Sequence, residues 1–171
     1  MLTMRHIVLY LCVFAVVCVV DSGCYSFTGS SVLPHLHTVA VPLFDDQSGS
    51  AEPNLRENLT NKLVDQFNRD NSLKVADKSH ADSMIEGVII AVPDAPKDIA
   101  GGETVTLRRI TVNCKVTYTD LKLKKKVFTD KPYSEWGDYA ASGSLTDRQN
   151  AVSAALDKLA QDIVLDTVSG W

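Results

Sequence analysis

The clearest alternation of apolar and polar residues in the chain lies in TVTLRRITVNCKVTYTD, residues 104–120. From Ile110 to Tyr118, apolar or small side chains alternate with polar ones, which is the period of a strand with one buried face. Val105 and Leu107 have the opposite parity, so a β-bulge is expected near Arg108–Arg109. The pattern therefore predicts one long strand in this part of the chain.

The neighbouring segments supply its partners. Val127–Tyr139, interrupted by Pro132, is expected to return as the second strand of a long hairpin, and Leu121–Lys126 is the connection between the two. Earlier in the chain, three further strands are predicted at Thr38–Phe44, Leu73–Ala76 and Ala81–Val92. Polar or Pro- and Gly-containing loops are predicted at Asp45–Glu52, Pro93–Gly102 and Ala140–Leu145.

Two segments have the period of amphipathic helices. In Pro53–Asp70 an apolar stripe is formed by Leu55, Leu59, Leu63, Val64 and Phe67. In Thr146–Val168 the stripe is formed by Val152, Ala155, Leu156, Leu159, Ala160 and Ile163. Capping pairs are expected at Asn54 with Glu57 and at Thr146 with Gln149.

This order of elements predicts an α+β fold. We expect a two-layer sandwich in which two helices pack on one face of a sheet of about four strands. No repeat and no second domain boundary is visible, so residues 38–171 are expected to form a single domain.

Composition limits the classes of protein that need to be considered. The chain has 171 residues, of which 45% are hydrophobic and 22% charged, and its formal net charge is −4. These values are typical of one globular domain and exclude a polytopic membrane protein or a disordered chain. The slightly acidic balance gives no reason to expect nucleic acid as a partner.

The first residues have the features of a secretory signal. Ile7–Val20 is a run of 14 apolar residues, shorter than the roughly 20 that a membrane span needs. The small residues Ser22 and Gly23 before Cys24 resemble a bacterial lipobox, although Asp21 stands where an apolar residue is usual. We expect residues 1–23 to be a lipoprotein signal peptide, with Cys24 as the lipid attachment site and residues 24–37 as a lipidated tether. An uncleaved signal anchor is the alternative.

The sequence offers little for catalysis. It contains no G-x-x-x-x-G-K-[ST], G-x-G-x-x-G, H-E-x-x-H or C-x-x-C motif. His35 and His37 have a spacing that two metal ligands could use, but they lie in the expected tether. After processing, Cys114 would be the remaining cysteine, and its place in an apolar strand favours a small core residue. We therefore expect neither an enzyme nor a cofactor or metal site.

One basic cluster stands out at the expected hairpin end. It consists of Lys122, Lys124, Lys125 and Lys126, with Arg108, Arg109 and Lys115 upstream on the adjoining strand. One interpretation is a solvated end that prevents edge-to-edge pairing. The other is contact with an anionic partner such as phosphorylated lipid headgroups. The aromatic residues Tyr133, Trp136 and Tyr139 on the returning strand favour packing in the core or at its rim over a ligand platform.

Several motifs, in order, resemble the LPS-assembly lipoprotein family (LptE). They are Gly23–Ser31, the strand Thr38–Phe44, Glu52–Thr60, the alternating strand Arg108–Thr119, the Trp136–Tyr139 segment, taken as a turn, and the closing Val168–Trp171. The family usually has Gly directly after the acylated cysteine, where this chain has Tyr25.

The resemblance implies a non-enzymatic lipoprotein of the cell outer membrane, anchored on the periplasmic side. Its implied partners are a β-barrel outer-membrane LPS-assembly protein, whose lumen it plugs, and lipopolysaccharide. Charge alone assigns lipopolysaccharide contact to Arg108, Arg109, Lys122, Lys124, Lys125 and Lys126. The alternative is a periplasm-facing lipoprotein that binds another protein or the cell wall and has no barrel partner.

Overall fold

A computed structural model describes residues 32–100 and 104–169. The expected signal peptide, Cys24 and the closing Trp171 lie outside the described residues. The elements follow in the order β1 Thr38–Ala40, β2 Asp45–Asp46, α2 Leu55–Asp70, β3 Lys74–Val75, β4 Ser83–Ala91, β5 Asp94–Ala100, β6 Thr104–Asp120, β7 Lys125–Ala140 and α3 Leu145–Val168.

Strand β6 is the centre of the sheet, as its alternation predicts. On one side its second half pairs with β4 and its first half with β5, both antiparallel, and β7 pairs along its other side. The even-numbered side chains from Ile110 to Tyr118 are at most 1% exposed. These side chains therefore form the buried face of the sheet, on which the core lies.

Among the described residues the sheet has seven strands, more than the roughly four predicted. The predicted loop Pro93–Gly102 contains β5, which pairs with β6 in spite of Pro96. An edge position explains this difference, because a proline at an edge can leave the ladder intact if its missing N–H would face outwards. In the predicted loop Asp45–Glu52, the first two residues form β2 and pair with β4.

The irregularity predicted near Arg108–Arg109 lies in the pairing of β5 with β6. Here the register shifts between the pairs Pro96–Arg108 and Asp98–Leu107, so that Lys97 is the extra residue of β5. Against β7, by contrast, β6 continues in register from Leu107 to Val116.

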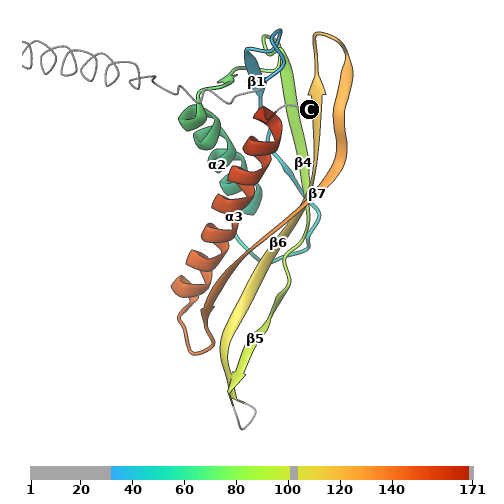
Figure 1. Cartoon of the computed structure of the whole chain (residues 1–171). Coiled ribbons are helices and arrows are strands. Elements are labelled where there is room, and N and C mark those ends of the chain that lie inside the picture. The colour runs from blue at the N-terminus through green and yellow to red at the C-terminus, as the bar shows by residue number, and fades with distance from the viewer. Residues whose placement is uncertain (1–31, 101–103, 170–171) are drawn as a thin grey trace, which may run out of the picture.

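Helices α2 and α3 pack side by side on one face of the sheet (Figure 1). Their predicted stripes face the core, and the residues at most 1% exposed include Leu59, Leu63, Phe67, Leu156, Leu159 and Ile163. Burial of each such side chain contributes about 1.5–3 kcal/mol to folding. The predicted α+β sandwich with both helices on one face is confirmed.

Both predicted helix caps are wrong. Helix α3 begins one residue earlier than expected, with a capping box formed by Ser144 and Asp147. The Ser144 hydroxyl lies 3.2 Å from the Asp147 backbone nitrogen, which donates to it. Asn54 precedes α2 in the left-handed region, with φ of 54°, and its side chain makes no capping hydrogen bond.

The segment Trp136–Tyr139, predicted to be a turn, lies within β7. Gly137 faces α3 there, and a Cβ atom at this position would stand 2.0 Å from the backbone oxygen of Ala151. The glycine thus permits a close approach of helix to strand rather than a change of chain direction.

Candidate functional site

The β6–β7 turn forms an exposed basic end of the molecule. Asp120 pairs with Lys125 where the turn closes, and its Oδ1 accepts a hydrogen bond of 2.8 Å from the backbone of Leu123. Lys125 and Lys126, predicted to lie in the connection, are the first residues of β7. Within the described part of the chain, the ammonium groups of Lys124, Lys125 and Lys126 have no ion-pair partner. We call Leu121–Lys126 the hairpin end.

Lys122 has a different role, because it ties the hairpin end to the segment before β1. Its Nζ lies 3.0 Å from Asp82 Oδ1 and donates to the backbone oxygen of His35 at 2.7 Å. Asp82 Oδ2 also accepts from the backbone nitrogens of His37, at 2.8 Å, and Thr38, at 3.2 Å. The hydrogen bond from His37 is the main reason why the pKa of Asp82 is lowered.

Asp120 completes this arrangement. Its residue is 1% exposed, and its Oδ2 lies 2.5 Å from His35 Nε2. Burial raises the pKa of Asp120, but the hydrogen bonds from Leu123 and His35 outweigh that effect and leave the pKa lowered. We call the group His35, Asp82, Asp120 and Lys122 the latch. The ring of His35 and the backbone nitrogen of His37 therefore hold this part of the expected tether in place, as does Leu36, which is 3% exposed.

Arg108 lies elsewhere, in an ion-pair cluster between β5 and α3. Its Nε is 2.9 Å from Asp94 Oδ1 and donates to the Tyr139 hydroxyl at 3.1 Å. These two partners raise the pKa of Arg108, the hydroxyl contributing most. Arg148 contacts the other oxygen of Asp94 at 3.0 Å and also pairs with Glu52.

Arg109 points to the opposite face of the sheet and is also paired. Its Nε lies 2.7 Å from Asp138 Oδ1, and its guanidinium carbon lies 4.7 Å from the centre of the Trp136 ring. Lys97 contacts the same aspartate at 2.8 Å. The Arg109 hydrogen bonds, followed by those of Lys97, hold the pKa of Asp138 well below its ordinary range.

The structure therefore does not bring the six predicted lipid-contact residues together. Arg109 and Asp120 are 11 residues apart on one strand, or about 36 Å at about 3.3 Å per residue. The four lysines lie at the hairpin end, whereas the charges of Arg108 and Arg109 are offset by Asp94 and Asp138.

Of the three β7 aromatic residues predicted to pack at the core or its rim, Tyr133 and Tyr139 do so, whereas Trp136 is exposed and stacks with Arg109. Tyr133 is 8% exposed, and its hydroxyl donates to Asp166 at 2.9 Å. Tyr139 is half-buried and donates to Asp94 at 2.6 Å. Trp136 is 38% exposed, and Lys158 donates to its backbone oxygen.

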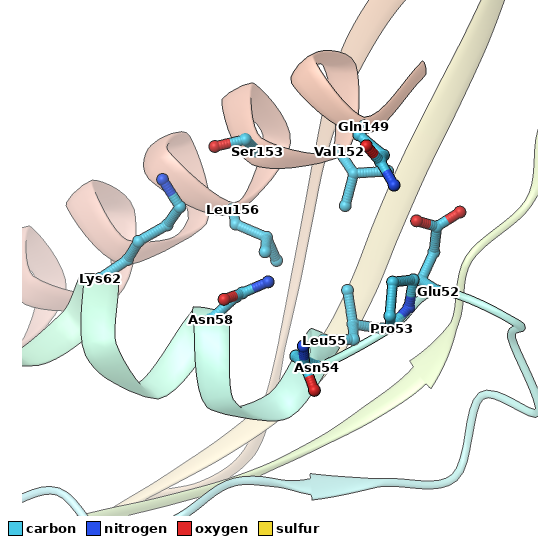
Figure 2. A pocket seen from close by; sticks show the side chains of 10 residues that line it. All are labelled: Glu52, Pro53, Asn54, Leu55, Asn58, Lys62, Gln149, Val152, Ser153 and Leu156. Atoms are coloured by element: carbon cyan, nitrogen blue, oxygen red, sulfur yellow. The ribbon is translucent and has the colours of Figure 1, made fainter. Parts of the chain in front are cut away.

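A hollow of about 420 Å³ lies between the first turns of α2 and the first half of α3 (Figure 2). Its apolar side chains are Pro53, Leu55, Val152 and Leu156, and amides of Asn58 and Gln149 lie around them. The ten residues that line it include neither histidine nor cysteine, and its charged side chains are those of Glu52 and Lys62.

Cys114 is fully buried, as expected of a core residue, and burial raises the pKa of its thiol to about 12. Across residues 32–100 and 104–169, no group of three His, Cys, Asp or Glu side chains could hold a metal ion. Within the same ranges, no helix is long and apolar enough to cross a membrane.

Comparison with protein families gives one match that covers most of the described domain. The model of the LptE family, described as lipopolysaccharide-assembly, matches residues 36–167. The chain belongs to the LptE family. The match begins at Leu36, where the chain enters the core, and ends in the last turn of α3. A comparison with curated proteins gave no match.

Solved structures share the LptE-family fold of this chain at low sequence identity. Protein XCC0632 from Xanthomonas campestris has a TM-score of 0.57 and 13% identity, and the alignment covers 80% of this chain and 89% of that one. The hypothetical protein CT253 from Chlamydia trachomatis has a TM-score of 0.58 and 13% identity, over 77% of this chain and 95% of that one. At such identities these likenesses show the fold alone.

Sequence reasoning missed the latch. Asp82 precedes β4 and Asp120 ends β6, and each is an ordinary polar residue at a strand end. Their function depends on the pairing of Ser83 with Asp120, which joins positions 37 residues apart. The local sequence offers no signal of that contact.

Proposed function

We propose that this LptE-family protein is an outer-membrane lipoprotein that assists lipopolysaccharide export. It is anchored through Cys24 on the periplasmic side, partners a β-barrel LPS-assembly protein and plugs the lumen of that barrel. The observation that carries the proposal is the family match over residues 36–167. The family assembles rather than catalyses, so the proposal includes no reaction and no cofactor.

Within this function, we assign lipopolysaccharide contact to the hairpin end. Lys124, Lys125 and Lys126 are exposed, lie next to one another and have no ion-pair partner among the described residues. Three ammonium groups on one turn suit a ligand that carries several phosphates. Lys122 is shared between this contact and the latch, whereas Arg108 and Arg109 are already ion-paired with Asp94 and Asp138.

Lipopolysaccharide binding by the purified protein tests both parts of the proposal. Wild-type protein should bind lipopolysaccharide, and binding should weaken as added salt screens exposed charges. Changing Lys124, Lys125 and Lys126 to Gln should weaken binding about tenfold or more, since each exposed charge-assisted contact contributes roughly 0.5–1 kcal/mol. Thermal stability should change little, because these charges lie outside the core.

A matched control changes three lysines on separate elements, Lys74, Lys78 and Lys158, to Gln. This control has the same net charge as the hairpin variant but should bind nearly as tightly as wild type. If the hairpin variant binds like wild type at low salt, the contact lies elsewhere. If wild-type protein does not bind lipopolysaccharide at all, the export function itself is wrong.

A further inference from the structure

Leu123 is an apolar residue fixed at the apex of the basic turn. It is 64% exposed, and it stands between Lys122 and Lys124. A single exposed leucine is common, but this one is held in place because its backbone nitrogen donates to the buried Asp120. The hairpin end thus presents one exposed apolar side chain that has a lysine on each side of it in the sequence.

The latch places this apex next to the point from which the chain leads to Cys24. Lys122 and Asp120 hold His35 through hydrogen bonds of 2.7 Å and 2.5 Å. Val32, the first described residue, is eight residues from Cys24, and even fully extended chain spans only about 3.6 Å per residue. A lipid on Cys24 would therefore hold Val32 within about 30 Å of the bilayer. The hairpin end is tied to His35, only three residues further along the chain.

We infer that the hairpin end rests on the anionic phospholipid surface in which Cys24 is anchored. Leu123 enters the boundary between headgroups and acyl chains, and Lys124, Lys125 and Lys126 lie at the level of the phosphates. An apolar side chain flanked by basic residues is the usual chemistry of contact with such an interface. The inference rests on the lipid anchor of the proposed function and adds a second, protein-mediated contact with the membrane.

The test uses the full-length acylated protein in vesicles of phosphatidylcholine and phosphatidylglycerol that contain no lipopolysaccharide. Leu123→Trp reports the environment of the apex after the wild-type tryptophan signal is subtracted. Its matched control is Leu145→Trp, because Leu145 is 69% exposed and begins α3 at the opposite end of the molecule (Figure 1). Brominated phospholipids quench a tryptophan only when it lies at the bilayer.

We expect at least several-fold stronger quenching, and a shorter emission wavelength, for Leu123→Trp than for Leu145→Trp. Adding Lys124→Gln, Lys125→Gln and Lys126→Gln should reduce the quenching at position 123. Equal quenching at the two positions would overturn the inference. Quenching at position 123 only after lipopolysaccharide is added would also overturn it and would leave the proposed function standing. A protein that is not acylated and stays in solution would overturn the inference and the anchor together.

Discussion

Three aspartates join segments that are distant in sequence, and each does so through hydrogen bonds with side chains of other segments. Asp94 connects β5 with α3 through Arg148, Asp138 connects β7 with β5 through Lys97, and Asp120 holds the chain before β1. Such an ion pair stabilises a protein more when its side chains are partly shielded from water than when they are fully exposed. Single residues therefore fix how the long strands and the helix layer meet.

Asp138 gives a pH-dependent prediction. Because Arg109 and Lys97 lower its pKa in the folded state, the ionised carboxylate stabilises the protein above its ordinary pKa of 3.8. That stabilisation is lost as the pH falls below 3.8. Asp138→Asn should therefore be less stable than wild type at pH 6, by about 1–2 kcal/mol, and the difference should shrink towards pH 2.

Urea unfolding at a series of pH values measures this difference. Asp77→Asn is the control, because Asp77 is exposed and makes no hydrogen bond or ion pair through its side chain in the described structure. It should match wild type at every pH. A constant difference between wild type and Asp138→Asn across the pH range would show that the ion pairs of Asp138 do not stabilise the fold.

Cys24 is the predicted lipid attachment site. Mass spectrometry of the mature protein should find an acylated Cys24 at the N-terminus, and Cys24→Ser should abolish membrane attachment. Cys114→Ser is the control, since this residue is buried in the core and should leave attachment unchanged. An N-terminus at any other residue would refute the lipoprotein assignment.

At the scale of elements, local patterns predict the helices and strands in which buried and exposed side chains recur with a regular period. The stripes of α2 and α3 and the alternation of β6 follow from contact with one core, so the sequence shows them directly. Strand β5 could not be predicted in the same way. It contains Pro96, and it is a strand because it pairs with β6, which its own sequence does not indicate. The latch has the same limitation, since it depends on which strands become neighbours.

The start of α3 gives a prediction at this scale. Ser144 is followed three residues later by Asp147, and Thr146 by Gln149, so two capping boxes compete in the sequence. In the structure only Ser144 caps the helix. Ser144→Ala should therefore lower the free energy of unfolding by about 0.5–2 kcal/mol. Thr146→Ala should change it by less than about 0.5 kcal/mol. Thermal unfolding measures both, and a larger effect at Thr146 would contradict the assigned cap.

At the scale of the whole molecule, the two ends are built from different elements. One end has the latch, the segment that leads to Cys24 and the basic turn, while the ribbon of β5 and the first half of β6 extends at the other (Figure 1). Trp136 and Ile90 remain 38% and 39% exposed. Which surface meets a barrel is a property of two chains, so neither the sequence nor the fold of one chain predicts it.

Co-purification in mild detergent tests whether this protein partners a β-barrel. The tagged protein is extracted from its native outer membrane, and its partners are identified and quantified by mass spectrometry. We expect one large β-barrel protein, present in a one-to-one ratio with this chain and absent when an unrelated outer-membrane lipoprotein carries the tag. Recovery of cell-wall fragments or a periplasmic protein, with no barrel in comparable amount, would contradict the account and favour a lipoprotein without a barrel partner.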